Sequence, residues 1–245
     1  MSTKVKQAAA KNGKTTNRLP EDLTASNGNG KAAASKASTL LVPPLKRMHI
    51  TMMLVSTSVM IQHRWSEKAK LAMRKKHAGE KTKNREVRDT KQEGIDATHL
   101  TKEGKYGFPA GALKKSVLTA AHKDLGVART MVTKSMFVLC KDPGNIIEME
   151  CDEPVIIEDT VTVGNNSTDL RYRPYFYHWR APVTFEIDSE WLTPQDLVNL
   201  VTRAGFGVGL LEWRPEKGGE CGRFEIDETV PIAIKEIKGG GAKFE

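Results

Sequence analysis

The stretch APVTFEIDSEWLTPQDLVNLVTRAG, residues 181–205, joins a strand pattern directly to a helix pattern. Apolar and polar residues alternate over VTFEI, as they do in a strand that buries one face. Thr193 and Pro194 then form a typical helix start, and apolar residues recur at helical spacing as far as Gly205. We predict a strand followed by a helix, which Gly205 ends in the left-handed conformation.

Elements of both kinds are predicted on either side of this stretch. Runs rich in apolar and β-branched residues predict strands, and one further segment has an apolar face at helical spacing. That segment has Pro109 near its start and Gly126 just past its end, as expected of a helix. The predicted strands cover 47–62, 131–140, 154–164 and 222–226, and the further helix covers 107–126.

The order of these elements predicts the fold class. It reads strand, helix, strand, a hairpin, strand, helix and strand. This βαββαβ order is that of the ferredoxin-like or RRM-like plait, in which two helices pack on one face of an antiparallel sheet. We therefore predict an α+β fold of this type.

Charge and composition divide the chain further. Residues 1–39 contain seven Lys/Arg, two acidic residues and no aromatic residue, which predicts a disordered basic arm. Residues 40–235 are predicted to form the RRM-like domain, with a basic helical insertion at 64–105 and a flexible tail at 236–245. The arm either binds a polyanion or only keeps the protein soluble, and the insertion is either polyanion-facing or simply solvated.

The whole chain indicates an intracellular protein. Its net charge is +8, and its three cysteines are too few and too scattered for a disulfide framework, which favours a reducing compartment. No run approaches the roughly 18 apolar residues of a membrane-spanning helix. The N-terminus lacks the apolar segment of a signal peptide, so we expect no membrane partner.

Two segments carry side chains that suit a nucleic-acid contact. LRYRPYFYHWR, residues 170–180, interleaves arginines, which can meet phosphates, with aromatic residues, which can stack on unpaired bases. EWRPEKGG, residues 212–219, places Trp213 and basic residues beside glycines, where a phosphate or a partner subunit can approach the backbone. The alternatives are a core-facing aromatic edge in the first segment and an internal Glu212–Arg214 salt bridge in the second, with the glycines serving only as turns.

These segments and the basic insertion supply the predicted binding residues. Nothing in the local pattern demands two consecutive glycines at 218–219, so we interpret them as ligand-facing backbone. Strand alternation predicts that one of Tyr175 and Phe176 lies in the core. The residues predicted to bind nucleic acid are Arg64, Lys68, Arg74, Lys75, Lys76, Arg171, Arg173, Tyr175, Tyr177, Arg180, Arg214, Lys217, Gly218, Gly219 and Arg223.

The patterns of catalysis and cofactor binding are weak. Gly205, Gly207 and Gly209 imitate part of a dinucleotide fingerprint, but they follow a helix instead of a strand. The histidines and cysteines show no metal-ligand spacing. A metal-independent nuclease could use His63 or His178 as acid or base, but an isolated histidine is more often structural. We expect no cofactor, no metal and no catalytic residue.

The glycine-rich segment GFGVG…GGECGRFEI, placed between the second helix and the last strand, resembles the RAMP superfamily of RRM-like proteins. These are the CRISPR backbone and processing subunits. The sequence lacks a clear RNA-cleaving histidine signature of that superfamily. IQHRWSEKAK, YGFPAGALKKSVLTAA, DLRYRPYFYHW and GLLEWRPEKGGECGRF together resemble an uncharacterised family of phage and prophage proteins, over roughly residues 45–230. The resemblances imply the cytoplasm of a bacterial cell or of a phage-infected host.

Three classes of function follow from these observations. The first is non-catalytic binding of single-stranded nucleic acid by a homo-oligomer or multi-subunit assembly, with subunits repeating along the strand. The second is a phage structural or assembly protein that acts through protein contacts. The third is a metal-independent RNA-processing enzyme. The sequence does not decide whether the nucleic acid is RNA or DNA, which base sequence is preferred, or how many subunits assemble.

Overall fold

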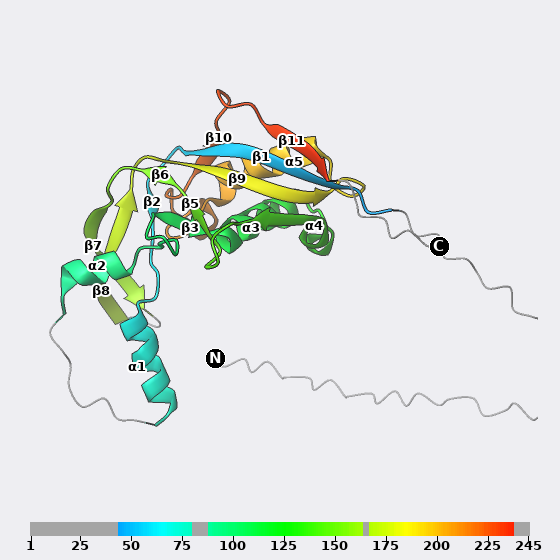
Figure 1. Ribbon diagram of the computed structural model, residues 1–245. Helices are drawn as coiled ribbons and strands as arrows, with labels where there is room; N and C mark the ends of the chain where they lie inside the picture. The colour runs from blue at the N-terminus through cyan, green and yellow to red at the C-terminus, as the bar shows by residue number, and fades with distance from the viewer. Residues whose placement is uncertain (1–43, 80–87, 164–166, 238–245) are drawn as a thin grey trace, which may run out of the picture. The chain divides into compact units, whose positions relative to one another are not determined.

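The residues that the computed structural model describes are 44–79, 88–163 and 167–237 (Figure 1). The chain divides into two units, Met1–Val42 and Pro43–Glu245, and the described residues all belong to the second. The predicted arm at 1–39 lies outside the described residues. So do part of the predicted insertion and most of the predicted tail.

An antiparallel main sheet forms the centre of the second unit. Its strands run in the order β10-β1-β9-β4. In addition, β11 pairs with the first half of β1, whose last residues pair with β10, and β6 pairs with the first two residues of β9. The pairing of β1 with β9 is the longest, from Arg47 opposite Asp188 to Val55 opposite Arg180. The strands are β1 Arg47–Ser56, β4 Met136–Leu139, β6 Glu150–Cys151, β9 Trp179–Asp188, β10 Phe224–Ile226 and β11 Ala233–Ile237.

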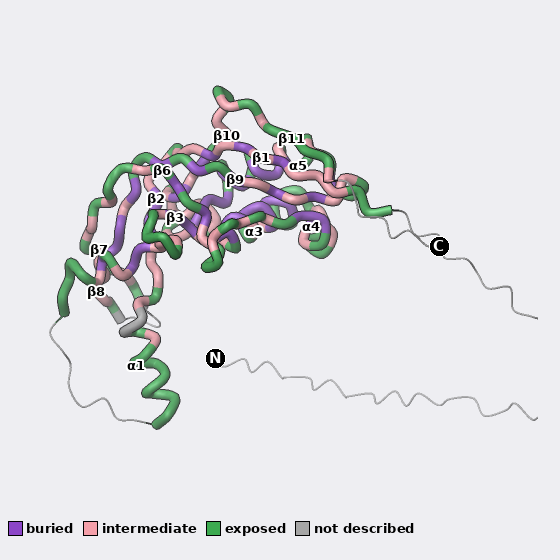
Figure 2. Tube along the Cα trace, viewed as in Figure 1, coloured by how far each residue is buried: buried purple, intermediate pink, exposed green. Residues whose placement is uncertain are grey.

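Helices cover one face of the main sheet and complete the core. Buried residues alternate with more exposed ones along β1 and β9 (Figure 2). Ile50 of β1 and Phe185 of β9 belong to one buried cluster with Leu113 of α3 and Leu197 of α5. Both helices continue into a wider turn, α3 into η1 and α5 into η2. The bounds are α3 Ala110–Thr119, η1 Ala120–Asp124, α4 Arg129–Ser135, α5 Pro194–Arg203 and η2 Ala204–Val208.

A smaller three-stranded sheet lies beside the main sheet. We call this sheet, together with helices α1 and α2, the hairpin lobe. Its strands run in the order β2-β8-β7, and α2 packs on β8 and β7 (Figure 1). Gly94 permits that packing, because a Cβ there would lie 2.3 Å from the side chain of Ile156. The bounds are β2 Met60–Ile61, α1 Glu67–His77, α2 Thr90–Asp96, β7 Val155–Val163 and β8 Ser167–Phe176. A separate pair joins β3 Gly107–Pro109 to β5 Ile146–Glu148.

The predicted α+β class is confirmed at the level of a mixed fold with antiparallel sheets and helices. The capping box at the start of α5 also forms as predicted, with Thr193 and Asp196 bonding reciprocally. Helices α1 and α2 fall within the predicted insertion. Strand β11 reaches Ile237, so the first two residues of the predicted tail at 236–245 are paired with β1.

Two predicted strands have different bounds in the structure. The segment 131–140 begins as helix α4, which buries Val132 and Ser135, and only its second half is strand. The segment 47–62 divides between two sheets, because the chain leaves the main sheet after Ser56 and joins the hairpin lobe at Met60. The buried Gln62 fixes this exit, since its side chain donates to the Gly107 carbonyl and accepts from the His99 amide.

Gly205 does not end its helix in the left-handed conformation, as the sequence predicted. The chain continues through η2, and the left-handed glycine is Gly209, with φ 75°. Gly205 is instead required by close packing, because a Cβ there would lie 2.0 Å from the carbonyl oxygen of Phe224. The sequence pattern therefore indicates correctly that this position needs a glycine, but for the wrong reason.

Candidate nucleic-acid interface

The glycine-rich loop between η2 and β10 contains an unusual backbone. Leu211 has φ 60° and Trp213 has φ 50°, and Asn145 is the other non-glycine residue with positive φ in the described part of the chain. A left-handed conformation at a bulky residue costs on the order of 1–3 kcal/mol, so the surrounding structure must enforce it. Strain of this kind is common where a side chain has to be presented in a fixed position.

Backbone hydrogen bonds to a distant part of the chain enforce this conformation. The Glu212 amide donates to the Ile61 carbonyl (3.3 Å), and the Gly222 amide donates to the Val59 carbonyl (2.7 Å). Within the loop, the Cys221 amide donates to the Trp213 carbonyl (2.9 Å). The loop is thereby fixed to the segment that leads into β2, and the Trp213 side chain remains 60% exposed.

The two consecutive glycines are required by this local structure, contrary to the sequence interpretation. Gly218 has φ 81° and ends the short helix η3 Pro215–Lys217. A Cβ on Gly219 would lie 1.9 Å from the Trp213 carbonyl oxygen. Both glycines therefore shape the loop around Trp213, which explains their occurrence without a ligand.

Arg214 stabilises the loop through an internal ion pair, as the alternative interpretation anticipated, although its partner is Glu216 and not Glu212. The guanidinium donates to the Glu216 carboxylate at 2.8 and 3.1 Å and to the Leu211 carbonyl at 2.6 Å. Lys123 donates to the other Glu216 oxygen at 2.8 Å. These bonds, from Lys123 first and then Arg214, lower the pKa of Glu216 to about 2.

Alternation along β8 divides the aromatic and basic residues of 170–180. Phe176 is buried in the core, while Tyr175 is partly buried and donates to the Asp159 carboxylate at 2.8 Å. Burial and that hydrogen bond raise the pKa of Tyr175 to about 12, so its hydroxyl stays a neutral donor. Tyr177 lies exposed in the turn between β8 and β9.

A cavity of about 380 Å³ opens where β8, the exit from β2 and the glycine-rich loop meet. We call it the arginine–tryptophan cavity, and it is lined by His63, Val161, Thr162, Arg171, Arg173, Glu212 and Trp213. It therefore brings two of the predicted arginines against the strained loop. A second cavity of about 450 Å³ shares His63 and Arg171 and is lined also by Arg64, Trp65 and Tyr172.

The two arginines of the arginine–tryptophan cavity differ in burial and in their partners. Arg173 is only 4% exposed and donates to Asp159 at 2.7 Å, so its charge is internally neutralised. Arg171 is more accessible, and its Nη1 lies 3.1 Å from both ring nitrogens of His63. Burial first, and Arg171 second, lower the pKa of His63, so its ring is neutral near pH 7 and can accept from Arg171.

The other predicted binding residues are distributed over several surfaces. Arg74, Lys75 and Lys76 are exposed in the last turn of α1, and the side chain of Lys68 lies outside the described residues. Arg180, Lys217, Gly218, Gly219 and Arg223 line neither of the two cavities. Arg180 is near Glu150 and Asp227, and the Arg223 guanidinium lies 5.2 Å from the ring centre of the exposed Phe206.

The site depends on side chains that the predicted set did not contain. Trp65, Trp213 and Glu212 line the cavities, and His63, which the sequence offered only as a possible acid or base, contacts Arg171. The sequence did offer one signal, because the chain has only four tryptophans and three of them, Trp65, Trp179 and Trp213, stand directly beside an arginine.

The open face of the main sheet does not provide the stacking surface of an RRM. RRM domains stack bases on aromatic residues of their central strands. Here the side chains of β1 and β9 that point away from the helices are not aromatic, and they bond to one another, as in His49 with Glu186 and Thr51 with Thr184, both at 2.9 Å. The hairpin lobe and the glycine-rich loop do carry exposed aromatic side chains suited to stacking, Trp65 and Trp213.

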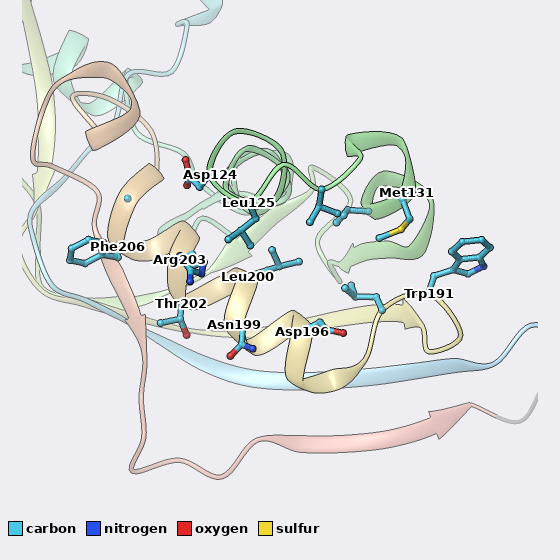
Figure 3. A pocket seen from close by; sticks show the side chains of 14 residues that line it. Asp124, Leu125, Met131, Trp191, Asp196, Asn199, Leu200, Thr202, Arg203 and Phe206 are labelled. Carbon is cyan, nitrogen blue, oxygen red and sulfur yellow. The ribbon is translucent and has the colours of Figure 1, made fainter.

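A separate groove of about 990 Å³ lies on the helical side of the main sheet. Leu125, Met131 and Leu200 contribute to its lining, with Trp191 at one end and Phe206 at the other (Figure 3). Trp191 is 65% exposed and Phe206 72% exposed. In contrast to the arginine–tryptophan cavity, this groove is mostly apolar.

Metal centres and membrane spans are two further classes of site to consider over the described residues. No group of three or more His, Cys, Asp or Glu side chains there is arranged to hold a metal ion. Within the same ranges, no helix combines the length and the apolar character needed to cross a membrane.

Comparisons with known proteins identify no family. No family model matches the chain, and no curated protein matches it. A solved structure, the cryo-EM structure of the type III-B Cmr-beta complex bound to cognate target RNA, contains a chain that aligns with a TM-score of 0.39 and 10% identity. The alignment covers 79% of this chain, which spans only 61% of that chain. A similarity this low carries no argument about function, and the resemblance to phage proteins stays a prediction.

Proposed function

We propose that this protein binds single-stranded nucleic acid without catalysing a reaction, with the arginine–tryptophan cavity as its base-binding site. The observation that carries the proposal is Trp213, an exposed indole on a strained backbone next to Arg171. Stacking of an unpaired base on an aromatic ring contributes about 1–3 kcal/mol. The hydrogen bonds to Val59 and Ile61 fix the backbone that carries the indole before binding, so little conformational entropy of the loop is lost when a ligand binds.

The charge arrangement supports a role for stacking more than for phosphate attraction at the cavity itself. Arg173 is neutralised by Asp159, and Arg171 lies 3.6 Å from Asp169. We propose that phosphates bind instead to the exposed basic residues in the last turn of α1, Arg74, Lys75 and Lys76. The basic arm at 1–39 is proposed to add attraction that is independent of sequence.

We also propose that the main sheet is a ferredoxin-like plait. Among its elements, β1, α3, β4, β9, α5 and β10 follow one another in βαββαβ order, and the strand order β10-β1-β9-β4 supports this topology. The domain division at 40–235, with an insertion at 64–105, follows from the same proposal. We further propose a relation to RAMP proteins and a cytoplasmic location.

One observation favours the second candidate function, contact with protein. The apolar groove exposes Trp191 and Phe206, and exposed apolar patches often mark association sites. Its lining contains two acidic residues, Asp124 and Asp196, and one basic residue, Arg203. Helix α1 carries exposed Leu71 and Met73 beside a basic last turn. A second copy of this chain, presenting α1 to the groove, therefore fits both the apolar and the charged parts, and repeated contacts of this kind would build an assembly along a strand.

The test of the binding proposal is a titration of labelled oligonucleotides followed by fluorescence anisotropy. Wild-type protein is expected to bind a single strand more tightly than the matching duplex. Trp213→Ala should weaken binding of the single strand by about 1–3 kcal/mol, and Trp213→Phe should restore most of it, because phenylalanine keeps a stacking face. Equal binding by all three proteins would contradict the proposal.

A further inference from the structure

Glu212 is a carboxylate in the wall of a cavity that otherwise presents arginine, histidine and tryptophan. Its backbone is fixed by the bond to Ile61 and by the left-handed residues on both sides of it. Its carboxylate lies 3.9 Å from Arg173, which is already bound to Asp159 at 2.7 Å. Within the described part of the chain, no hydrogen bond is donated to the Glu212 carboxylate.

A carboxylate in this position constrains the ligand. A phosphate next to Glu212 would be repelled by a like charge, so the ligand group that reaches it has to be a hydrogen-bond donor. An ionised carboxylate has two oxygens that only accept, and it binds most strongly to two donors presented side by side. Arg171, which lines the same cavity, instead calls for a hydrogen-bond acceptor on the ligand.

We propose, building on the binding function proposed above, that the arginine–tryptophan cavity selects guanine. Stacked on Trp213, a guanine presents its adjacent N1–H and N2–H donors to the two oxygens of Glu212. Its O6 and N7 acceptors are groups that arginine binds in pairs, and Arg171 is the accessible arginine of the cavity.

The other bases match Glu212 less well. Adenine and cytosine each offer one amino group, so only one carboxylate oxygen is used. Uracil offers a single N3–H between two carbonyl oxygens, which the carboxylate repels. Stacking on Trp213 does not discriminate among the bases, because every base has an aromatic face. The preference therefore resides in Glu212.

The experiment uses the full chain and a short oligouridine of about seven nucleotides with one central position varied, in ribo and deoxy forms. The central base is guanine, hypoxanthine, adenine, cytosine or uracil, and anisotropy gives Kd for each. The oligonucleotide with guanine should bind about tenfold more tightly than the one with uracil, as expected for hydrogen bonds to a charged group. Hypoxanthine lacks the 2-amino group and should fall between them.

Two glutamate variants assign the preference to its residue. Glu212→Gln should reduce the guanine advantage to less than threefold. Glu220→Gln removes the same charge from an exposed position of the same loop that lines neither cavity, and should keep the full advantage.

The outcomes separate the two proposals. Equal affinity of the wild-type protein for all five bases, or a guanine preference that survives in Glu212→Gln, overturns the inference and leaves the binding function intact. A wild-type protein that binds none of the oligonucleotides overturns the binding function itself.

Discussion

The arginine–tryptophan cavity and the apolar groove both expose a tryptophan, but the chain builds them differently. Trp191 lies at one end of a groove that is lined mostly by apolar side chains (Figure 3). Trp213 has a left-handed backbone, and its loop is hydrogen-bonded to the backbone of Val59 and Ile61, far earlier in the chain. Arginine, histidine and glutamate side chains line the same cavity. The difference indicates two kinds of partner: an apolar protein surface for the groove, and a flat polar ring with hydrogen-bonding edges for the cavity.

The largest expected effect comes from removing the geometry that presents Trp213. Gly219→Val places a side chain against the Trp213 carbonyl, where even a Cβ would be 1.9 Å away, so the loop must open. We expect a loss of about 2–4 kcal/mol in the free energy of unfolding, together with loss of oligonucleotide binding. Chemical denaturation and anisotropy measure the two effects.

Gly218→Ala is the matched control for this change. Gly218 has open space where a Cβ would be, so the substitution costs only its left-handed conformation, about 1 kcal/mol. Binding should survive in Gly218→Ala. If Gly219→Val also binds normally, the loop does not position Trp213 and the comparison between the two tryptophans fails.

A smaller effect is expected from the Arg214–Glu216–Lys123 cluster that braces the loop. The pKa of Glu216 is lowered to about 2 in the folded state from an ordinary value of 4.5. Its stabilisation is therefore fully present above pH 4.5 and is lost as the pH falls towards 2. Glu216→Gln should lower stability by about 1–2 kcal/mol at pH 7 and flatten the pH dependence between 4.5 and 2. An unchanged pH profile of unfolding in Glu216→Gln would show that the cluster does not brace the loop.

The smallest effect is expected from the exposed lysines of α1. Lys75→Gln with Lys76→Gln should weaken binding slightly and reduce the slope of log K against log salt by roughly 0.7 for each phosphate that these lysines bind. Lys134→Gln with Lys141→Gln removes the same charge from exposed positions on α4 and beyond β4, and should leave the slope unchanged. Equal slopes in the two double variants would remove α1 from the interface.

Local patterns were sufficient for β9 and α5 of the main sheet and not for the site. The alternation in β9 and the capping box of α5 depend on neighbouring residues, so the sequence shows them directly. The position of Trp213 depends on carbonyls of Val59 and Ile61, which no local pattern reveals. Gly219 was interpreted as ligand-facing backbone because the local pattern does not show the atom that requires a glycine there, the carbonyl oxygen of Trp213.

The same distinction explains the errors within the fold. The helix α4 was predicted as strand because MVTKS is rich in β-branched residues, and the burial of Val132 and Ser135 against the rest of the core overrides that propensity. The exit of the chain after Ser56 depends on Gln62, whose hydrogen bonds reach Gly107 and His99. Each of these features is decided by partners far away in the sequence.

The most direct test of the account measures both tryptophans in both assays. Trp213→Ala and Trp191→Ala are compared for affinity to a short single strand, by anisotropy, and for self-association at increasing protein concentration, by analytical ultracentrifugation. The account predicts that Trp213→Ala loses about 1–3 kcal/mol of binding and keeps wild-type sedimentation, whereas Trp191→Ala keeps binding to the short strand and sediments as a smaller species. A Trp213→Ala protein that binds the short strand as tightly as wild type would contradict the central claim that the strained loop exists to present a base-stacking surface.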